Sequence, residues 1–278
     1  MSLRPLAPKK RFSQNFLTDN RTALKISQQL TVSPSDVILE IGPGTGALTT
    51  HLLDTTARRL VAVDVDPRAV DAVQHLVDAH PKRLEVRQAD ILTTRLSEVF
   101  DGIAPKNIVV IGNIPYAITS EILFWIFDQR FHMRQCVIMM QREVARRCVA
   151  RPGTKDYGIL SVASWYASEA KQVMTVQPGS FFPRPDVTSA VVRFDLRQQA
   201  PTEAPFKPFM AFVRAAFSQR RKVLTNALAS WATTNVVDLR AEPGVCDIDL
   251  SKTRAEQLEP EVLARVFEEL TNQREMRS

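Results

Sequence analysis

The sequence predicts an α/β fold with a mostly parallel, doubly wound sheet of seven strands, followed by a small all-helical domain. Short β-rich runs alternate with segments of helical periodicity, which is typical of a parallel sheet covered by helices. After Phe194 a linker with Gln and Pro, residues 198–205, precedes a tail with almost no strand-like runs. We therefore expect a first domain at residues 1–197 and a helical domain at residues 198–278.

Seven runs of the first domain are predicted strands, and the first five are separated by segments with helical spacing. Residues 67–79, for example, place Val70, Val73 and Val77 on one face of a helix. No long helix separates the last two runs, so we expect them to form an antiparallel hairpin at the sheet edge. The predicted strands are residues 37–41, 60–63, 84–87, 108–111, 136–140, 171–176 and 187–194.

The composition suits a nucleic-acid partner and argues against metal or disulfide chemistry. With 278 residues, 45% of them hydrophobic, the chain can bury a full core, and its net charge of +6 suits a polyanion. The three cysteines are too few and too scattered for a disulfide framework, and they do not combine with the four histidines at metal-ligand spacing. We expect no metal site.

No segment has the length that a membrane span or a signal peptide requires. The longest aromatic and aliphatic run, residues 122–127, is far too short to cross a bilayer. The amino terminus lacks the apolar core of a signal peptide. We therefore expect a soluble cytoplasmic protein with no membrane partner.

The most informative stretch is Asn-Ile-Pro-Tyr, which begins at Asn113 just after a predicted strand. Ligands of parallel sheets lie outside the carboxyl ends of the strands. There the side-chain oxygen of Asn113 and the backbone carbonyl of Ile114 can accept the two N–H bonds of an exocyclic base amine. Pro115 restricts the direction of that carbonyl, and Tyr116 can stack on the base. The stretch thus predicts an amino-methylating enzyme; the alternative is a plain turn after a strand.

A second motif, Glu-Ile-Gly-Pro-Gly-Thr-Gly, begins at Glu40 and leads from the first predicted strand into a helix. Gly42 and Gly44 let the backbone approach a ligand closely, and helix amides point into the same space. Asp64 ends the second predicted strand, 22 residues after Gly42, where a carboxylate can accept both hydroxyls of a ribose. A dehydrogenase would show the same features, and so would a tight turn beside a solvated Asp.

Asp90 follows the third predicted strand and favours the methyltransferase hypothesis in part. Its carboxylate can accept a hydrogen bond from the adenine amine of a bound nucleoside. Dehydrogenases do not require an acid at this place. The alternative for Asp90 is an N-cap of the turn that follows.

Together these motifs resemble the ribosomal RNA adenine N6-dimethyltransferases, which use S-adenosylmethionine and have a Rossmann-like class I methyltransferase fold. The resemblance extends from about residue 9 to the end of the chain. Residues 157–161 and 217–222 are similar to the bacterial KsgA (RsmA) branch of the KsgA/Dim1/Erm family rather than to the Erm methylases. The matching motifs are Gln-Asn-Phe-Leu from Gln14, the glycine-rich stretch from Glu40, Asp64, Asp90, Asn-Ile-Pro-Tyr from Asn113 and Phe-Phe-Pro-Arg-Pro from Phe181.

The resemblance implies a role for each cofactor-binding position. The segment from Gln14 closes over the cofactor, Gly42 faces its methionine part, and Asp64 and Asp90 face its ribose and adenine. The expected cofactor-binding residues are Gln14, Asn15, Leu17, Glu40, Gly42, Gly44, Asp64, Asp90 and Asn113.

The resemblance also implies how the target base is held. Phe181 is expected to sandwich the base opposite Tyr116, although a core aromatic is the alternative for Phe181. The methyl group would pass in line from sulfur to nitrogen, with catalysis resting on positioning and polar surroundings. The expected catalytic residues are Asn113, Ile114, Pro115, Tyr116 and Phe181.

Two positions depart from the family pattern. Ser13 stands where the family often has glycine, and Asp64 stands where glutamate is usual. We expect Asp64 to reach less far without changing the cofactor, and Ser13 to bear on the conformation of the amino-terminal segment.

The resemblance names the substrate as two adjacent adenosines in the hairpin loop near the 3′ end of 16S ribosomal RNA, on an assembling 30S subunit. Each target base must leave its stack to be methylated. We expect a monomer whose basic residues, partly on a tail helix at residues 207–231, contact phosphates. A solvated basic helix face is the alternative. The expected RNA contacts are Arg142, Arg146, Arg147, Arg214, Arg220, Arg221 and Lys222.

Two further hypotheses stay open. A nicotinamide-dependent dehydrogenase would need a proton relay, and the motifs contain no histidine or cysteine that could provide one. A non-catalytic RNA-binding assembly or transcription factor could keep the fold, but the intact motifs argue against a loss of catalysis.

Overall fold

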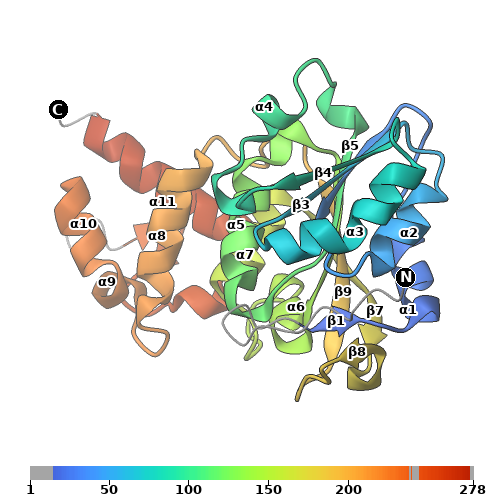
Figure 1. Ribbon diagram of the computed structural model, residues 1–278. Helices are drawn as coiled ribbons and strands as arrows, with labels where there is room; N and C mark the ends of the chain where they lie inside the picture. Colours follow the sequence, from blue (N-terminus) through green and yellow to red (C-terminus); the bar gives the residue numbers. More distant parts are fainter. Residues whose placement is uncertain (1–14, 238, 240–243, 276–278) are drawn as a thin grey trace. The chain divides into compact units, whose positions relative to one another are not determined.

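A mostly parallel sheet of seven strands lies at the centre of the first part of the chain (Figure 1). The computed structural model describes residues 15–237, 239 and 244–275. In chain order the strands are β2 (Val37–Ile41), β3 (Arg59–Asp64), β4 (Leu84–Gln88), β5 (Ile108–Asn113), β6 (Gln135–Gln141), β7 (Ser168–Val176) and β9 (Ser189–Leu196). They lie side by side in the order β4-β3-β2-β5-β6-β9-β7, and β9 runs antiparallel to both of its neighbours.

This topology confirms the predicted fold class and the antiparallel hairpin at the sheet edge. β9 pairs with β7 from Leu196 opposite Ser168 to Ser189 opposite Val176, and it inserts between β7 and β6. The strand ends agree with the predicted runs to within three residues. β5 continues beyond its predicted end to Asn113, so this residue belongs to the strand itself.

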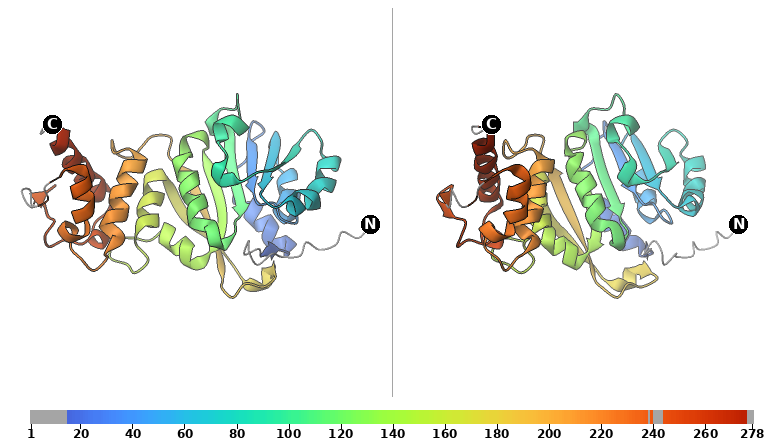
Figure 2. Two further views of the ribbon diagram at one scale, coloured as in Figure 1. Left: turned by 60° about the vertical axis from the view of Figure 1, so that its left-hand side comes forward. Right: turned by 90° about the vertical axis from the view of Figure 1, so that its left-hand side faces the viewer.

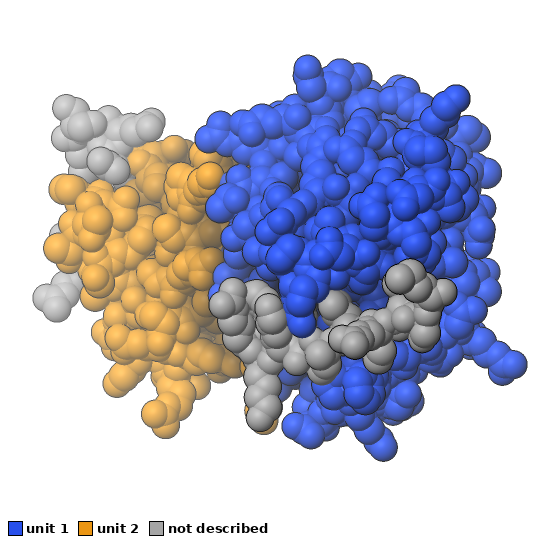
Figure 3. Space-filling view, in the orientation of Figure 1, with its two compact units in different colours: residues 1–145, 168–198 blue, residues 146–167, 199–278 orange. Residues whose placement is uncertain are grey.

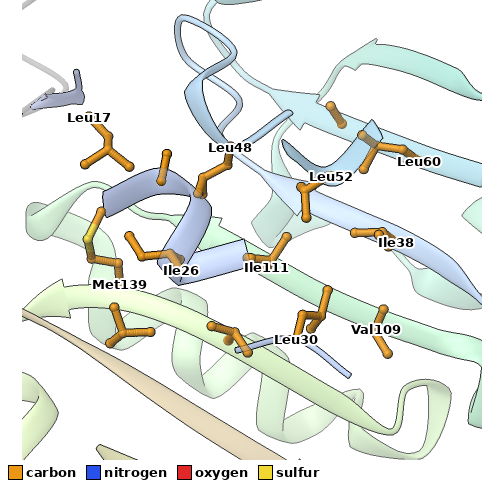
Figure 4. Packing of buried hydrophobic residues seen from close by; sticks show 14 of the residues in the cluster. Leu17, Ile26, Leu30, Ile38, Leu48, Leu52, Leu60, Val109, Ile111 and Met139 are labelled. Carbon is orange, nitrogen blue, oxygen red and sulfur yellow. The ribbon is translucent and has the colours of Figure 1, made fainter. Parts of the chain in front are cut away.

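The main core lies between one face of this sheet and the helices α1 (Asn20–Ser27) and α2 (Ala47–Leu53) (Figure 4). Ile26 of α1 and Leu52 of α2 are fully buried in one cluster with sheet residues such as Ile38. Burial of apolar side chains of this kind is the main favourable contribution to folding. The two helices are thereby held against the strands that carry the motifs.

α3 (Pro67–Ala79) has the predicted bounds, and its sequence explains where it begins. Asp66 caps the helix through its side chain, and a proline at the first position suits a helical turn that needs no amide donor there. Leu76 and Val77 pack against the same cluster as α1 and α2, so α3 covers the same face of the sheet.

The opposite face of the sheet is covered by α5 (Thr119–Asp128). The ring of Phe127 lies 5.6 Å from that of Phe194 in β9, edge to face. Phe194 is three positions from Val191, which belongs to the first cluster, and residues an odd number apart on a strand face opposite sides. Helices therefore cover both faces, as a doubly wound sheet requires (Figure 2).

The structure divides the chain into two compact units (Figure 3). The first contains residues 1–145 and 168–198, and the second contains residues 146–167 and 199–278. Residues 146–167, which the sequence analysis assigned to the first domain, thus lie in the second unit. The helices of the second unit are α7 (Ile159–Ala167), α8 (Phe206–Ser218), α9 (Leu224–Ala227), α10 (Ala229–Asn235) and α11 (Pro260–Glu275).

An aromatic cluster forms the core of the second unit. The ring of Phe212 lies 5.0 Å from that of Trp231 and 5.6 Å from that of Phe267, so α8, α10 and α11 meet at this point. Aromatic pairs at such distances contribute about 0.5–1.5 kcal/mol beyond the burial of their area.

The short elements of the chain are α4 (Leu96–Val99), α6 (Arg142–Cys148), β1 (Phe16–Leu17), β8 (Phe181–Phe182), β10 (Gly244–Val245), β11 (Ile248–Asp249) and the 3-10 helices η2 (Ile91–Thr93), η3 (Pro105–Asn107), η4 (Tyr116–Ile118), η5 (Arg130–His132), η6 (Pro178–Ser180) and η7 (Ala255–Gln257).

The expected single tail helix at residues 207–231 is wrong, because the chain leaves the helix after Ser218. Residues 219–223 form a turn in which the Arg220 guanidinium pairs with Glu256. The amide of Leu224 then donates to the Thr253 carbonyl at 2.8 Å. Phe217 and Leu224 are seven residues apart, which is about two helical turns, so the apolar pattern looks continuous although the helix ends between them.

Among the residues that the structure describes, no helix combines the length and apolar character needed to span a membrane.

We expect Gly112→Ala to destabilise the protein by about 1–3 kcal/mol, as overpacking of a core does. A Cβ at this position in β5 would lie only 2.8 Å from the Ile41 carbonyl oxygen of the neighbouring strand, and neither backbone can move without breaking the ladder. Gly179→Ala is the control, because nothing lies within 4 Å of a Cβ there. Denaturant unfolding measures both variants, and equal unfolding midpoints for the two would contradict the expectation.

Candidate functional site

A pocket lies at the carboxyl ends of the parallel strands in the first unit. Its lining comes from segments far apart in the chain, and most of them follow or end a strand of the sheet. This is the place where open α/β sheets bind ligands. The lining residues are 15–17, 40–45, 47–48, 63–65, 89–91, 113–118 and 122.

The register of the sheet brings three of the predicted site residues side by side. Ile41 of β2 lies opposite Val63 of β3 on one side and opposite Gly112 of β5 on the other. The residue that follows in each strand is therefore at the same edge, and these residues are Gly42, Asp64 and Asn113.

Asn113 is oriented by a bond to the amino-terminal segment. Its Nδ2 donates to the backbone carbonyl of Asn15 at 3.1 Å. Because Nδ2 points at the Asn15 carbonyl, Oδ1, the other end of the planar amide, points away from it and is available as an acceptor. The half-buried side chain thus presents an oxygen within the pocket lining.

The next three residues are held by the sheet and by a short helix. Ile114 is 1% exposed, so its side chain belongs to the core and its backbone carbonyl is the group that can act. Pro115 accepts a hydrogen bond from the Thr119 hydroxyl at 3.1 Å. Tyr116 begins η4, and its hydroxyl lies 2.5 Å from Oγ of Ser189 in β9. All three line the pocket, and burial raises the pKa of the Tyr116 phenol, which therefore stays neutral.

Glu40 is a fully buried acid on the core face of β2. Its register neighbours are Ala62 and Ile111, both apolar. Oε2 accepts a hydrogen bond from the Thr49 hydroxyl at 2.8 Å, whereas Oε1 has no hydrogen-bond partner among the described residues. Burial, aided by the charge of nearby Asp64 and opposed by the hydrogen bonds from Thr49, raises the pKa of Glu40 to about 7. A buried, unpaired oxygen in a pocket lining is suited to a hydrogen-bonding or cationic ligand.

The glycine-rich loop and Asp64 form the adjoining wall. Gly44 has φ +55°, and a Cβ there would lie 3.0 Å from the Phe16 ring, so close packing of β1 on the loop requires glycine. Asp64 accepts the backbone N–H of Asp66 at 2.9 Å. Desolvation is the largest influence on the pKa of Asp64 and raises it, while backbone donors including Gly44 oppose that effect.

Asp90 both lines the pocket and caps a helix. Its Oδ1 accepts the backbone N–H of Leu92 at 2.9 Å and so caps η2. The capping alternative is therefore realised in the structure, and it leaves Asp90 beside the pocket. Capping also fixes the side-chain direction of Asp90.

Phe181 does not lie where the sequence analysis expected it. It is 5% exposed, belongs to the core cluster with Leu17, and does not line the pocket. In the ribbon of β1 and β8, Phe181 lies opposite Leu17 and Phe182 opposite Phe16. Side chains alternate along a strand, so Phe181 points to the core and Phe182, 59% exposed, points the other way. The structure thus favours the core-aromatic alternative for Phe181.

Two of the three expected amino-terminal residues line the pocket. Gln14, like Ser13, lies outside the described residues. Asn15 and Leu17 both line the pocket, although Leu17 is 3% exposed and is largely a core residue. Phe16 lines the pocket as well; the sequence analysis quoted it within a motif but gave it no role.

The expected RNA contacts are all exposed, and the contacts of Arg220 within the protein are clear. Arg220 donates to Glu256 through Nε and Nη2, and to the Lys155 carbonyl through Nη1 at 3.0 Å. This network holds the turn after α8, so Arg220 has a structural role. The other exposed residues are Arg142, Arg146 and Arg147 in α6, Arg214 in α8, and Arg221 and Lys222 in the following turn.

Ser189 was missed because sequence reasoning offers no signal for it. It is a small polar residue at the start of a strand, 73 residues from Tyr116 in the chain. Only the order of the strands brings the two hydroxyl groups together. Among the described residues, no group of three or more acids, histidines and cysteines could hold a metal ion.

Comparisons with known proteins agree with this geometry. A family model described as ribosomal RNA adenine dimethylase matches residues 6–272. A protein of Chlorobaculum parvum, named ribosomal RNA small subunit methyltransferase A, is 38% identical over 266 residues, 96% of this chain and 90% of that protein. A protein of the same name from Chlorobium phaeobacteroides is 40% identical over 265 residues, 95% of this chain and 92% of that protein.

A solved structure has the same fold over nearly the whole chain. The crystal structure of a dimethyladenosine transferase from Plasmodium falciparum superimposes with a TM-score of 0.76 at 26% identity, covering 93% of this chain and 98% of that one. Together with the family match, this similarity confirms the resemblance seen in the sequence. The chain belongs to the ribosomal RNA adenine dimethylase family.

Proposed function

We propose that this enzyme transfers methyl groups from S-adenosylmethionine to N6 of two adjacent adenosines in the 3′-terminal hairpin loop of 16S ribosomal RNA. The observation that carries the proposal is that the stretch beginning at Asn113 and the loop beginning at Glu40 line one pocket. Cofactor groups and base-holding groups therefore meet at a single sheet edge, which transfer between two bound molecules requires.

The residues of this pocket fit S-adenosylmethionine. The unpartnered Oε1 of Glu40 suits the ammonium of the methionine part, because a cation there would compensate a buried carboxylate. Asp64, at the end of β3, suits the ribose hydroxyls. Asp90, after β4, suits the adenine amine. When bound, the cofactor supplies an electrophilic methyl group on a positively charged sulfur.

Asn113 and Ile114 hold the target amine in this proposal. The lone pair of an adenine amine is delocalised into the ring, so the nitrogen is a poor nucleophile. The Asn113 Oδ1 and the Ile114 carbonyl would accept its two N–H bonds, which favours a tetrahedral nitrogen whose lone pair points at the methyl group. Tyr116 provides the ring face on which the flipped base stacks.

Catalysis by this pocket rests on positioning. The described residues that line it include no histidine, cysteine or lysine. The amide and peptide oxygens are neutral acceptors that orient the amine but do not retain its proton, which passes to solvent after transfer. A binding site that orients both reactants accounts for large accelerations without a nucleophilic side chain.

The exposed basic residues of α6, α8 and the turn after α8 are proposed to contact RNA phosphates. Phosphate contacts of this kind position a protein on RNA without reading its sequence. We further propose that the natural substrate is an assembling 30S subunit in the cytoplasm and that the enzyme acts as a monomer. Methylation mapping on unmodified small subunits, with labelled S-adenosylmethionine, tests the substrate directly.

Asn113→Ala should retain cofactor binding but lose at least about a hundredfold in methyl transfer, as expected when a positioned acceptor is removed. The control is Asn107→Ala, just before the other end of the same strand. Calorimetry measures the cofactor affinity, and incorporation of labelled methyl groups into small subunits measures the rate. Unchanged turnover in Asn113→Ala would refute the proposed role.

Cofactor affinity should fall as the pH drops below 7. Because the pKa of Glu40 is about 7, a growing fraction of the carboxyl holds a proton there, and that proton must leave before the group can pair with an ammonium. We expect up to about a tenfold loss of affinity per pH unit, with proton release on binding. Calorimetry in buffers of different ionisation enthalpy measures both.

Glu40→Gln cannot titrate and should bind the cofactor more weakly, with this pH dependence absent. Glu98→Gln, on the exposed helix α4, should behave like the unchanged protein. If Glu40→Gln kept the full pH slope, another group would be responsible.

Replacing Arg221 and Lys222 by alanine should weaken RNA binding and reduce the slope of log affinity against log salt by about 0.7–0.9 for each phosphate that the protein no longer neutralises. Cofactor affinity should not change. The charge-matched control replaces Lys82 and Lys106, which are exposed in the first unit. Filter binding over a salt series measures the slopes, and equal slopes for both double variants would contradict a specific role for the turn.

A further inference from the structure

Ser189 has a fixed position in the centre of the first unit. It is the first residue of β9, and it pairs with Gln141 of β6 on one side and Val176 of β7 on the other. Its side chain is completely buried. A residue held by two strand neighbours cannot shift without disturbing both ladders, so the Ser189 hydroxyl is a rigid point of attachment.

The partner of this hydroxyl is the Tyr116 phenol, at 2.5 Å. Tyr116 belongs to η4, a single turn between the end of β5 and α5. Short 3-10 segments have poorer hydrogen-bond geometry than α-helices. The phenol oxygen lies on the long axis of the ring, so fixing it at one end and the Cα at the other fixes the direction of that axis.

The bond is between neutral groups. Burial raises the pKa of the Tyr116 phenol, so it keeps its proton and can donate to Ser189. Hydrogen bonds of neutral hydroxyls are directional and shorter than those of amides. The bond therefore restricts ring orientation without adding charge to a pocket that must accept a cationic reactant.

We propose that Ser189 is a positioning residue for the reaction, which holds the ring of Tyr116 in the orientation that stacks on the flipped target base. This inference rests on the proposed function, in which Tyr116 supplies that ring face. It assigns to β9 a part in catalysis although Ser189 itself does not line the pocket. A purely structural hydroxyl would affect stability but not the kinetics of transfer.

The contact can be tested without activity. The chain has three tyrosines, so protein labelled with 3-fluorotyrosine should give three fluorine resonances. The Tyr116 signal is identified by its loss in Tyr116→Phe. We expect this signal to shift in Ser189→Ala and to stay in place in Ser27→Ala, which removes a buried hydroxyl that donates to the Leu24 carbonyl of its own helix. An unmoved signal in Ser189→Ala would overturn the contact.

Kinetics test the positioning role. Ser189→Ala should lower kcat on small subunits by about tenfold or more, since small misplacements in a pre-oriented site are costly. The KM and Kd for S-adenosylmethionine should stay within about twofold, because Ser189 does not line the pocket. Ser27→Ala should keep the full kcat.

A double-variant cycle separates positioning from general destabilisation. Tyr116→Phe removes the other half of the same bond, so the pair of changes should cost no more in kcat than the larger single change. Three results would each overturn the proposal. The first is a loss of kcat in the double variant equal to the product of the two single losses, and the second is a full kcat in Ser189→Ala. The third is a loss of cofactor affinity in Ser189→Ala as large as its loss of kcat. If the unchanged protein failed to methylate small subunits, the proposed function itself would fall, whereas activity insensitive to Ser189 would remove this inference alone.

Discussion

The pairing of β2 with both β3 and β5 is the constraint on which the site depends. Parallel strands in register end at one edge, so the residues after the Ile41 row, Gly42, Asp64 and Asn113, become neighbours although they are far apart in the chain. Close approach of Ile41 to Gly112 keeps these strands in tight contact, since no Cβ fits between them. Each part of the site is thus an extension of the sheet and inherits its rigidity.

A site embedded in an apolar sheet must bury polar groups, and most of the groups buried here have a hydrogen-bond partner. Glu40 lies between apolar neighbours and retains one hydrogen bond, from Thr49, while its second oxygen has no partner among the described residues. The phenol of Tyr116 reaches Ser189, and the Asn113 amide reaches the Asn15 carbonyl. Of these groups, only the Glu40 oxygen is left uncompensated within the described part of the chain, which is the state expected of a group reserved for a ligand.

Much of the fold could be predicted because local patterns and tertiary demands agree. Alternating strand and helix patterns indicated the order of the elements, and the apolar spacing over residues 67–79 agrees with the bounds of α3. The prediction of a single tail helix was wrong because local pattern and tertiary contacts disagree there. The apolar spacing continues from Phe217 to Leu224, but the ion pair of Arg220 and backbone hydrogen bonds to a distant segment turn the chain. A periodic pattern records which residues are apolar and not whether the backbone between them stays helical.

By itself the sequence placed the binding edge, because Asn113, Asp64 and the glycines each lie at or just after the end of a strand and parallel strands share one binding edge. The class of chemistry came from the stretch at Asn113, from Asp90 and from the resemblance of the whole set of motifs. The sequence could not decide whether Phe181 packs in the core or stacks on a base, because an aromatic ring suits both places. Only the pairing of β1 with β8 directs Phe181 into the core and Phe182 outward. The sequence could not show the contact between the hydroxyl groups of Ser189 and Tyr116 either. That contact depends on β9 inserting beside β6, and the pairing of strands distant in sequence is decided only by the packing of the whole sheet.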